Sequence, residues 1–233
     1  MGIIGGADGP MVICLGNWEL TPVTLCLLLG VLGLIAYFIG NISPSTIMAK
    51  RRGLDIKKEG SGNAGTTNAL RVMGKKAGAI ACIVDILKGV AAVLIGAAIA
   101  GNIGAYICAL CVFLGHVWPI VYKFQGGKGV ATTFGAVVTV NPLIGVICLA
   151  IVALIVFASK RMSAGSVAGA IAFLVLSVFL EPFFTGPAVV MAAVMLVKHR
   201  ANISRLIHGE EPVMGIFGHE EKNAAEEGEH GDE

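Results

Sequence analysis

The chain has 233 residues, of which 56% are hydrophobic and only 14% charged, with 32 glycines and a formal net charge of +2. Its mean hydropathy is +0.84. Soluble domains carry about 25% charged residues, so these values exclude an ordinary soluble globular protein. They predict an all-α fold, a polytopic membrane helical bundle.

The first 22 residues are expected to be an extracytoplasmic extension. The segment is rich in glycine, and Asp8 and Glu19 are its charged residues. Since the positive n-region of a secretory signal is missing, we expect the first apolar run to stay in the membrane as an anchor. The extension is assigned no function.

Seven apolar runs separated by short polar stretches make up most of the chain. They cover residues 23–42, 77–100, 103–121, 130–140, 143–158, 164–180 and 188–197. This spacing predicts about seven transmembrane helices. The fourth and seventh runs are shorter than the ~20 residues that a perpendicular helix needs, so we expect them to be tilted, half-inserted or packed around a cavity.

Positive charge is distributed unevenly over the connections between these runs. The basic connections are 50–76, 123–128, 160–161 and 198–205, whereas 101–102, 141–142 and 181–182 carry no Lys or Arg. Cytoplasmic loops carry the excess of Lys and Arg. The pattern therefore predicts an N-terminus outside, a cytoplasmic C-terminus, and polar motifs that all face the cytoplasm.

The first polar motif, GSGNAGTTNALR, covers residues 60–71. It combines three glycines with Ser, Thr and Asn side chains, and Arg71 lies one turn into the next predicted helix. Short donors together with a guanidinium that can bind bidentately suit an oxyanion. An ordinary polar loop seldom has this density of glycine and short donors, so the motif favours anion binding.

The second motif, QGGKGVAT, covers residues 125–132. It fails the phosphate-binding P-loop pattern, because Tyr122 and Gly129 stand where that pattern needs Gly and Ser or Thr. Glycines still allow close backbone approach, Lys128 supplies a charge, and a helix that starts at Val130 would favour an anion. A flexible positive-inside loop explains these eight residues equally well.

The third motif, KHRANISRL, covers residues 198–206 and is expected to be helical. His199, Asn202 and Arg205 then lie close to one helix face. Alone, the segment is better explained as a basic helix at the membrane surface. Three such motifs on one side of the membrane favour a shared anionic ligand.

These motifs, together with GHVWP at 115–119 and HRANISRLIHGEE at 199–211, resemble the bacterial acyl-phosphate-dependent glycerol-3-phosphate acyltransferases, the PlsY family. The resemblance runs from about residue 35 to residue 211, with the motifs in family order. It implies a seven-span inner-membrane enzyme that moves an acyl group from acyl phosphate to the sn-1 hydroxyl of glycerol 3-phosphate. The products are lysophosphatidic acid and inorganic phosphate, in phospholipid synthesis.

The resemblance also implies the site. The catalytic residues would be Ser61, Arg71, Lys128 and His199. The substrate-binding residues would be Asn63, Thr67, Asn68, Gly127, Gly129, Ser163 and Asn202. We expect no cofactor and no metal. The general base is open between His199 and a substrate phosphate.

Three further polar residues lie in or at the end of apolar runs. Asp85 and Lys88 are three residues apart, and because isolated charges are costly in a membrane, we expect a structural ion pair. His116, in the GHVWP motif, either orients the glycine loop or is a satisfied structural histidine.

The resemblance and the composition together predict the domain limits and partners. Residues 23–211 would form the transmembrane acyltransferase domain, and residues 212–233 an acidic disordered tail with little to bury. The expected partners are both substrates, the lipid bilayer and the acyl-phosphate-forming enzyme, and no nucleic acid.

Two other functions are alternatives to this one. Soluble-type acyltransferases that use acyl-CoA need an Asp five positions after a His, and Val121, Ser204, Val213 and Ala224 occupy those positions here. A membrane carrier for an organic phosphate is the remaining alternative. Against it, the polar residues cluster on one side of the membrane, whereas a carrier needs a path through.

Overall fold

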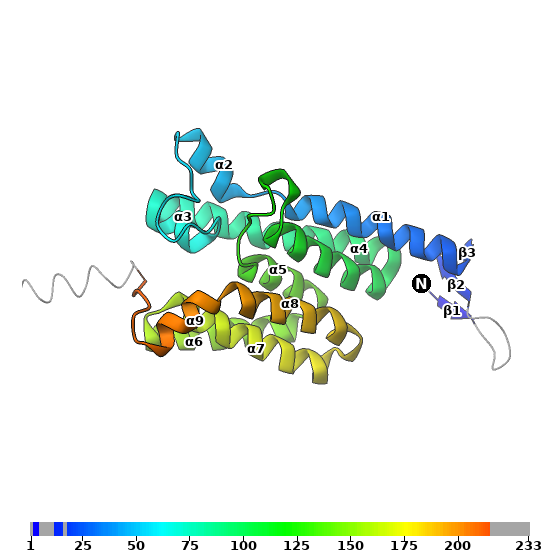
Figure 1. The fold of residues 1–233 in the computed structure, drawn as a ribbon. Helices are drawn as coiled ribbons and strands as arrows, with labels where there is room; N and C mark the ends of the chain where they lie inside the picture. The colour runs from blue at the N-terminus through cyan, green and yellow to red at the C-terminus, as the bar shows by residue number, and fades with distance from the viewer. Residues whose placement is uncertain (1, 5–11, 16–17, 215–233) are drawn as a thin grey trace, which may run out of the picture.

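The computed structural model describes residues 2–4, 12–15 and 18–214. A three-stranded antiparallel sheet, β1 (Gly2–Ile4), β2 (Val12–Leu15) and β3 (Trp18–Leu20), lies before the first helix in the order β1-β2-β3 (Figure 1). The glycine-rich sequence of this extension does not predict the sheet. Its short runs of β-branched residues, such as Ile3–Ile4 and Val12–Ile13, favour extended backbone.

The rest of the described chain is helical, which confirms the predicted all-α membrane bundle. The helices are α1 (Pro22–Gly40), α2 (Pro44–Arg51), α3 (Thr66–Met73), α4 (Lys75–Val117), α5 (Val130–Val140), α6 (Pro142–Ser159), α7 (Met162–Leu180), α8 (Thr185–Lys198) and α9 (Arg200–Ile207), with 3-10 turns η1 (Ile120–Tyr122) and η2 (Pro182–Phe184). Four of them, α1, α4, α6 and α7, are long and apolar enough to cross a membrane, and α8 with α9 forms a bent fifth candidate.

The difference from seven predicted spans has two causes. The predicted helices at 77–100 and 103–121 both fall in α4, but the backbone leaves helical geometry at Ala100 (φ −128°, ψ 21°) and Gly101 (φ 59°, ψ −149°). The chain turns back there, and the backbones of Gly96 and Gly104 pack directly against each other. The fourth run forms α5, which has 11 residues and is too short to count as a span.

Helix starts follow local sequence signals. Thr21 caps α1 through its side chain, which accepts a hydrogen bond from the Thr24 amide. Asn141 caps α6 by accepting from the amides of Leu143 and Ile144, and in both helices Pro occupies the first turn. Asn141 is the single residue between α5 and α6, so the two helices form a tight hairpin.

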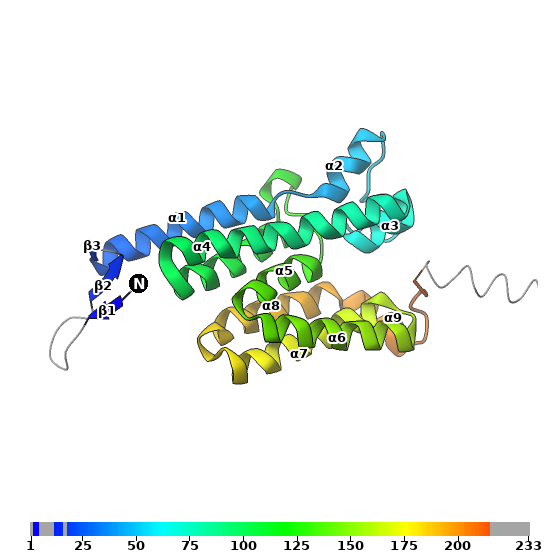
Figure 2. The same cartoon turned by 180° about the vertical axis from the view of Figure 1, so that it is seen from behind.

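The two halves of α4 occupy the centre of the bundle. α1 packs along α4 on one side and α5 on the other, and α5 connects this layer to α6, α7 and α8 (Figure 2). The interior uses small residues such as Ala92 and Ala109, both fully buried, so helices approach closely. Large apolar side chains such as Phe157 (77% exposed) and Phe179 (76%) point outward, as expected for lipid-facing surface.

Candidate functional site

A cavity of about 1050 Å³ lies between the α3–α5 part of the bundle and α6–α9. The predicted site residues that line it are Ser61, Asn63, Thr67, Asn68, Arg71, Lys128, Gly129, Ser163, His199 and Asn202. Segments that are distant in sequence therefore meet around one space. Gly127 is the exception among the predicted residues, because it is buried behind the cavity wall.

The first glycine-rich loop, residues 53–65 ahead of α3, is held by one side chain. Asn68 Nδ2 donates to the carbonyls of Ile56 (3.2 Å) and Glu59 (3.0 Å), and Asn68 Oδ1 accepts from the Ser61 amide (2.9 Å). Asn68 is 1% exposed. Its amide group is thus used by the loop backbone, which makes Asn68 a positioning residue, while Ser61 is exposed and lines the cavity.

The second glycine-rich loop, residues 123–129 ahead of α5, is held by tertiary contacts. The amides of Gly126 and Gly127 donate to the carbonyls of Val117 and His116, both at 3.2 Å. Gly127 lies so close to the His116 ring that a Cβ there would overlap it. This close approach, rather than contact with the cavity, is what requires glycine at position 127.

The end of this loop points the start of α5 into the cavity. Gly129 has φ +87°, and a Cβ there would also overlap the Phe113 ring. Val130, Ala131 and Thr133 from the first turn of α5 line the cavity. The Thr133 hydroxyl is buried and has no hydrogen-bond partner among the described residues. The free amides of a helix start and an unpaired buried hydroxyl both suit an anion.

The two loops are tied to each other. Lys57 Nζ, from the first loop, donates to the Tyr122 carbonyl at 3.1 Å. Lys50 Nζ, from α2, lies 5.4 Å from the centre of the Tyr122 ring. These contacts fix the approach of the 53–65 loop to the 123–129 loop across the mouth of the cavity.

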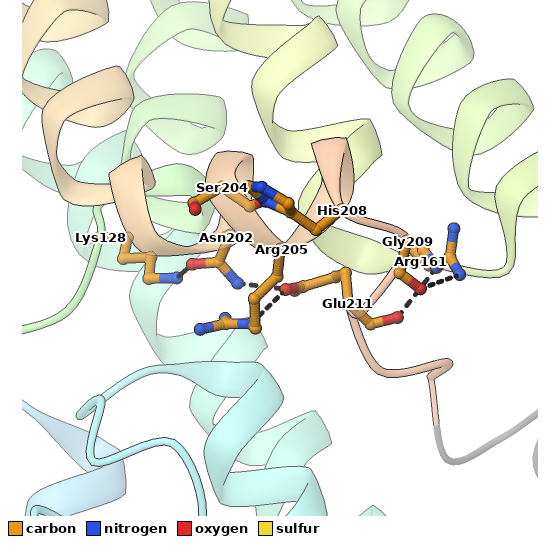
Figure 3. Close-up of polar contacts among 8 residues, drawn as sticks. All are labelled: Lys128, Arg161, Asn202, Ser204, Arg205, His208, Gly209 and Glu211. Atoms are coloured by element: carbon orange, nitrogen blue, oxygen red, sulfur yellow. Dashed lines mark hydrogen bonds and ion pairs between the residues drawn. The ribbon is translucent and has the colours of Figure 1, made fainter.

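A polar network joins Lys128 to the third motif (Figure 3). Lys128 Nζ donates to Asn202 Oδ1, and Asn202 Nδ2 donates to Glu211 Oε1 at 2.6 Å. Arg205 Nε donates to Glu211 Oε2 at 2.7 Å. Arg161 donates to the carbonyls of Glu211 (2.9 Å) and, outside this network, Gly209 (3.3 Å). The chain after α9 is thereby held against the cavity.

Glu211 is the member of this network for which the sequence predicts no role, although it ends the 199–211 motif and the predicted acyltransferase domain. Its signal was a carboxylate that follows a basic helix. Burial acts to raise the pKa of Glu211, but the hydrogen bonds from Asn202 and Arg205 and the charge of Arg205 outweigh it and hold the pKa below its usual value. Glu211 is therefore ionised at neutral pH and orients Asn202 and Arg205.

The electrostatics of the cavity favour an anion next to Lys128. Burial, together with repulsion from Arg205, Arg71 and Lys198 and against attraction from Glu211, lowers the pKa of Lys128 to about 8. The ammonium is still mostly charged at pH 7. Several cations that face one another across a cavity need a negative ligand to offset their repulsion.

His199 lies between α8 and α9 and is buried. Its Nδ1 donates to the Met195 carbonyl at 2.8 Å, which leaves Nε2 as the acceptor nitrogen. Burial first, and then repulsion from Lys128, lower the pKa of His199 to about 4. The ring is neutral at pH 7, a state suited to binding a hydroxyl group.

The buried charges in α4 form the expected ion pair. Lys88 Nζ lies 2.7 Å from Asp85 Oδ1 and also 2.7 Å from His116 Nδ1. The His116 carbonyl and ring both contact the 123–129 loop. Sequence reasoning left His116 open between orienting the glycine loop and a satisfied structural role, and the structure gives it both contacts.

The far part of the cavity is apolar. Its walls come from α5, α6 and α7 and include Phe134, Val137, Leu149, Val152 and Phe173. The cavity thus combines a cationic, glycine-rich end with an apolar end inside the bundle. That combination suits an amphiphile with an anionic head.

Comparison with known proteins gives consistent results. Residues 30–209 match the family model described as glycerol-3-phosphate acyltransferase. Curated relatives of that name from Thermoanaerobacter sp. (strain X514) and Clostridioides difficile (strain 630) are each 44% identical, over 78% and 79% of this chain and 93% and 95% of theirs.

Solved structures agree with these relatives. The chain is similar to crystal structures of PlsY, an integral membrane glycerol 3-phosphate acyltransferase, in glycerol 3-phosphate and lysophosphatidic acid forms. Both are 33% identical to this chain. The glycerol 3-phosphate form has a TM-score of 0.77 and covers 82% of this chain and 97% of its own. The lysophosphatidic acid form has a TM-score of 0.73 and covers 80% of this chain and 95% of its own. These matches decide against the carrier alternative: the chain belongs to the glycerol-3-phosphate acyltransferase family.

Proposed function

We propose that the acyl donor is acyl phosphate and that the acceptor is the sn-1 hydroxyl of glycerol 3-phosphate. The observation that carries this proposal is the cavity itself, in which Lys128, Arg71 and Arg205 surround one end while the other end is apolar. Two phosphates and one acyl chain need such a space. An acyl-CoA donor would bring a large nucleotide, and none of the motifs found in the sequence indicates a nucleotide-binding site.

The reaction then needs little covalent help from the protein. The sn-1 hydroxyl oxygen attacks the acyl carbonyl carbon, the bond between that carbon and the phosphate oxygen breaks, and inorganic phosphate leaves. Lys128 and the start of α5 stabilise charge on the departing phosphate. Arg71 and Ser61 hold the glycerol 3-phosphate head, so that positioning supplies much of the rate.

The hydroxyl proton goes to the phosphate that leaves. A neutral His199 with a pKa of about 4 is a weak base at pH 7. A phosphate dianion is a stronger base, since the conjugate acid of a phosphate monoester dianion has a pKa of about 6. His199, through Nε2, instead accepts a hydrogen bond from the acceptor substrate. Asn202, Asn63, Thr67 and Ser163 complete the polar wall around it.

We propose a bacterial cytoplasmic (inner) membrane location, with the cavity open to the cytoplasm. Lys50, Lys57, Arg71 and Lys128 lie at the end of the bundle that holds the two loops, whereas the connection at 141–142 carries no Lys or Arg. Positive-inside counting assigns the basic end to the cytoplasm. The N-terminus is then outside. The chain has seven membrane segments if the two halves of α4 are counted separately and α5 is counted as a short segment. The acyl-phosphate-forming enzyme can deliver its product from the cytoplasm.

The domain limits follow from the same arrangement. Residues 23–211 form the acyltransferase unit, since Glu211 closes the polar network, and residues 1–22 are an outer extension. The predicted acidic tail, 212–233, lies mostly outside the described residues.

The experiment that tests the donor measures phosphate release by purified protein given acyl phosphate, with and without glycerol 3-phosphate, and in parallel with acyl-CoA. We expect release that requires glycerol 3-phosphate, and 1-acyl product formed from acyl phosphate alone. Product from acyl-CoA at an equal rate would refute the donor assignment, and a 2-acyl product would refute the regiochemistry.

A further inference from the structure

Beneath the 123–129 loop lies a buried triad of Asp85, Lys88 and His116, whose side chains are 2%, 3% and 6% exposed. We propose that His116 donates a hydrogen bond through Nε2 to the phosphate group of the acyl donor, and that Lys88 and Asp85 are positioning residues that fix the ring for this task. The proposal deepens the proposed function, because it rests on a phosphate being bound at that loop.

The first step is the tautomer of His116. Lys88 Nζ donates to the Ile42 carbonyl at 2.7 Å, forms the ion pair with Asp85 and lies 2.7 Å from His116 Nδ1. An ammonium group can only donate, so Nδ1 accepts from Lys88 at 2.7 Å rather than donating to Asp85 Oδ1, which lies farther away at 3.4 Å. The proton of the neutral ring is therefore on Nε2.

The second step is the direction of Nε2. His116 lines the cavity, and Nε2 is the ring atom nearest to the position that a Cβ on Gly127 would take. The absence of a side chain at Gly127 thus lets the loop backbone lie against this edge of the ring, and any side chain there would displace the ring. The same residue is anchored through its backbone, where the His116 carbonyl accepts from the Gly127 amide at 3.2 Å.

The third step is the chemistry around that donor. Lys128 is the next residue after Gly127, and the first turn of α5 begins two residues after Lys128. A neutral N–H donor, an ammonium group and helix-start amides converge on one region, and each of them favours a phosphate oxygen. A buried ion pair that fixes an uncharged donor also adds no further charge to the cavity.

Two substitutions separate the two ring nitrogens. His116→Asn keeps an acceptor near the Nδ1 position for Lys88 but has no group at the Nε2 position, whereas His116→Gln places an amide N–H near Nε2. We expect His116→Asn to lower kcat/KM for acyl phosphate roughly 10- to 100-fold, the range for one hydrogen bond to a charged group. His116→Gln should recover a large part of that loss.

A second readout is inhibition by inorganic phosphate. In His116→Asn the inhibition constant of phosphate should rise about 10-fold or more, while KM for glycerol 3-phosphate stays within about twofold. His208→Asn is the matched control, because His208 is exposed and does not line the cavity. Thermal unfolding in detergent checks that each variant is folded.

Several outcomes would overturn the proposal. They are wild-type kcat/KM in His116→Asn, an equal loss in His116→Asn and His116→Gln, or a loss of rate with unchanged phosphate inhibition. Failure of the donor assignment is distinct: wild-type protein would then make no product from acyl phosphate. The Asn and Gln variants would still be compared with the donor that does react.

Discussion

The two glycine-rich loops at the cavity have similar compositions but are held in different ways. The 53–65 loop is fixed mainly by a nearby residue, through the amide group of Asn68, and its one distant tie described above is that of Lys57 to the Tyr122 carbonyl. The 123–129 loop is fixed by distant partners, since its glycines pack against His116 and Phe113 of α4. A loop held mainly by one side chain can therefore be made more mobile by a single substitution without affecting the rest of the bundle. A loop packed against a core helix can be altered only if that helix is disturbed as well.

The largest expected effect is at the charged residue of the second loop. Lys128→Ala removes the cation next to the departing phosphate, and we expect kcat to fall by roughly 10²–10³-fold or more. The measurement is lysophosphatidic acid formation by protein shown to be folded by thermal unfolding in detergent. Lys123→Ala is the control, as it changes an exposed lysine of the same loop that does not line the cavity. Near-normal turnover by Lys128→Ala would remove the loop from the active site.

The next effect separates backbone strain from core packing. Gly129→Ala and Gly74→Ala both place a Cβ at φ +87°, but at Gly74 no described atom lies within 4 Å, whereas at Gly129 the Cβ overlaps Phe113. Each substitution carries backbone strain of about 1–3 kcal/mol. The larger share falls on Gly74, whose ψ of 175° is adopted almost only by glycine, whereas Gly129 has a ψ of −4°. Overpacking adds about 1–3 kcal/mol at Gly129 alone.

We expect Gly129→Ala to displace the start of α5 and to lose activity about 10-fold or more, while Gly74→Ala keeps it. Steady-state rates and unfolding temperatures of the two variants test this difference. An equal loss of activity in both variants would mean that the contact of position 129 with Phe113 of α4 does not matter for the site.

A smaller effect is expected from the clamp on the first loop. Asn68→Ala removes three hydrogen bonds from the 53–65 loop, each worth about 0.5–1.5 kcal/mol. Because that loop carries Ser61, KM for glycerol 3-phosphate should rise several-fold with little change for acyl phosphate. Asn68→Asp, which keeps the acceptor for the Ser61 amide but loses both donors, should lie between. A parallel rise of KM for both substrates would show that the two loops act as one unit.

The smallest effect is on the pH profile. Because the pKa of His199 is lowered to about 4, the ring is neutral in wild-type protein above pH 5. The alanine of His199→Ala is also uncharged, so the substitution does not change the charge at this position in that range. The acidic limb of kcat between pH 5 and 7 should keep its midpoint in this variant, although the rate falls. A midpoint that moves with the substitution would identify His199 as the titrating base.

The same pKa shift affects stability, with a definite sign. The unfolded chain binds a proton at His199 near pH 6.5, whereas the folded chain binds it near pH 4. The stabilisation linked to the neutral ring is therefore present above pH 6.5 and is lost as the pH falls toward 4. Unfolding temperatures of wild-type protein and His199→Ala across this range should converge at the acidic end.

The sequence by itself determined the membrane class, the helical fold and the polar motifs that line one end of the cavity. Apolar runs are long enough to be recognised because the bilayer sets a minimum length, and caps such as Thr21 and Asn141 act within three residues of where they stand. The polar motifs were recognisable because glycine, short donors and basic residues rarely occur together in an apolar chain.

Only the tertiary structure decided which polar residues serve a ligand and which serve the protein. The sequence predicts that Asn68 binds substrate, but its side-chain NH₂ group donates to backbone carbonyls 9 and 12 residues away in the chain. Glu211 and the Nδ1 atom of His116 find theirs on other segments, Asn202 and Lys88. Hydrogen bonds depend on distance and direction in space, and a linear pattern records neither once the partners lie on different helices.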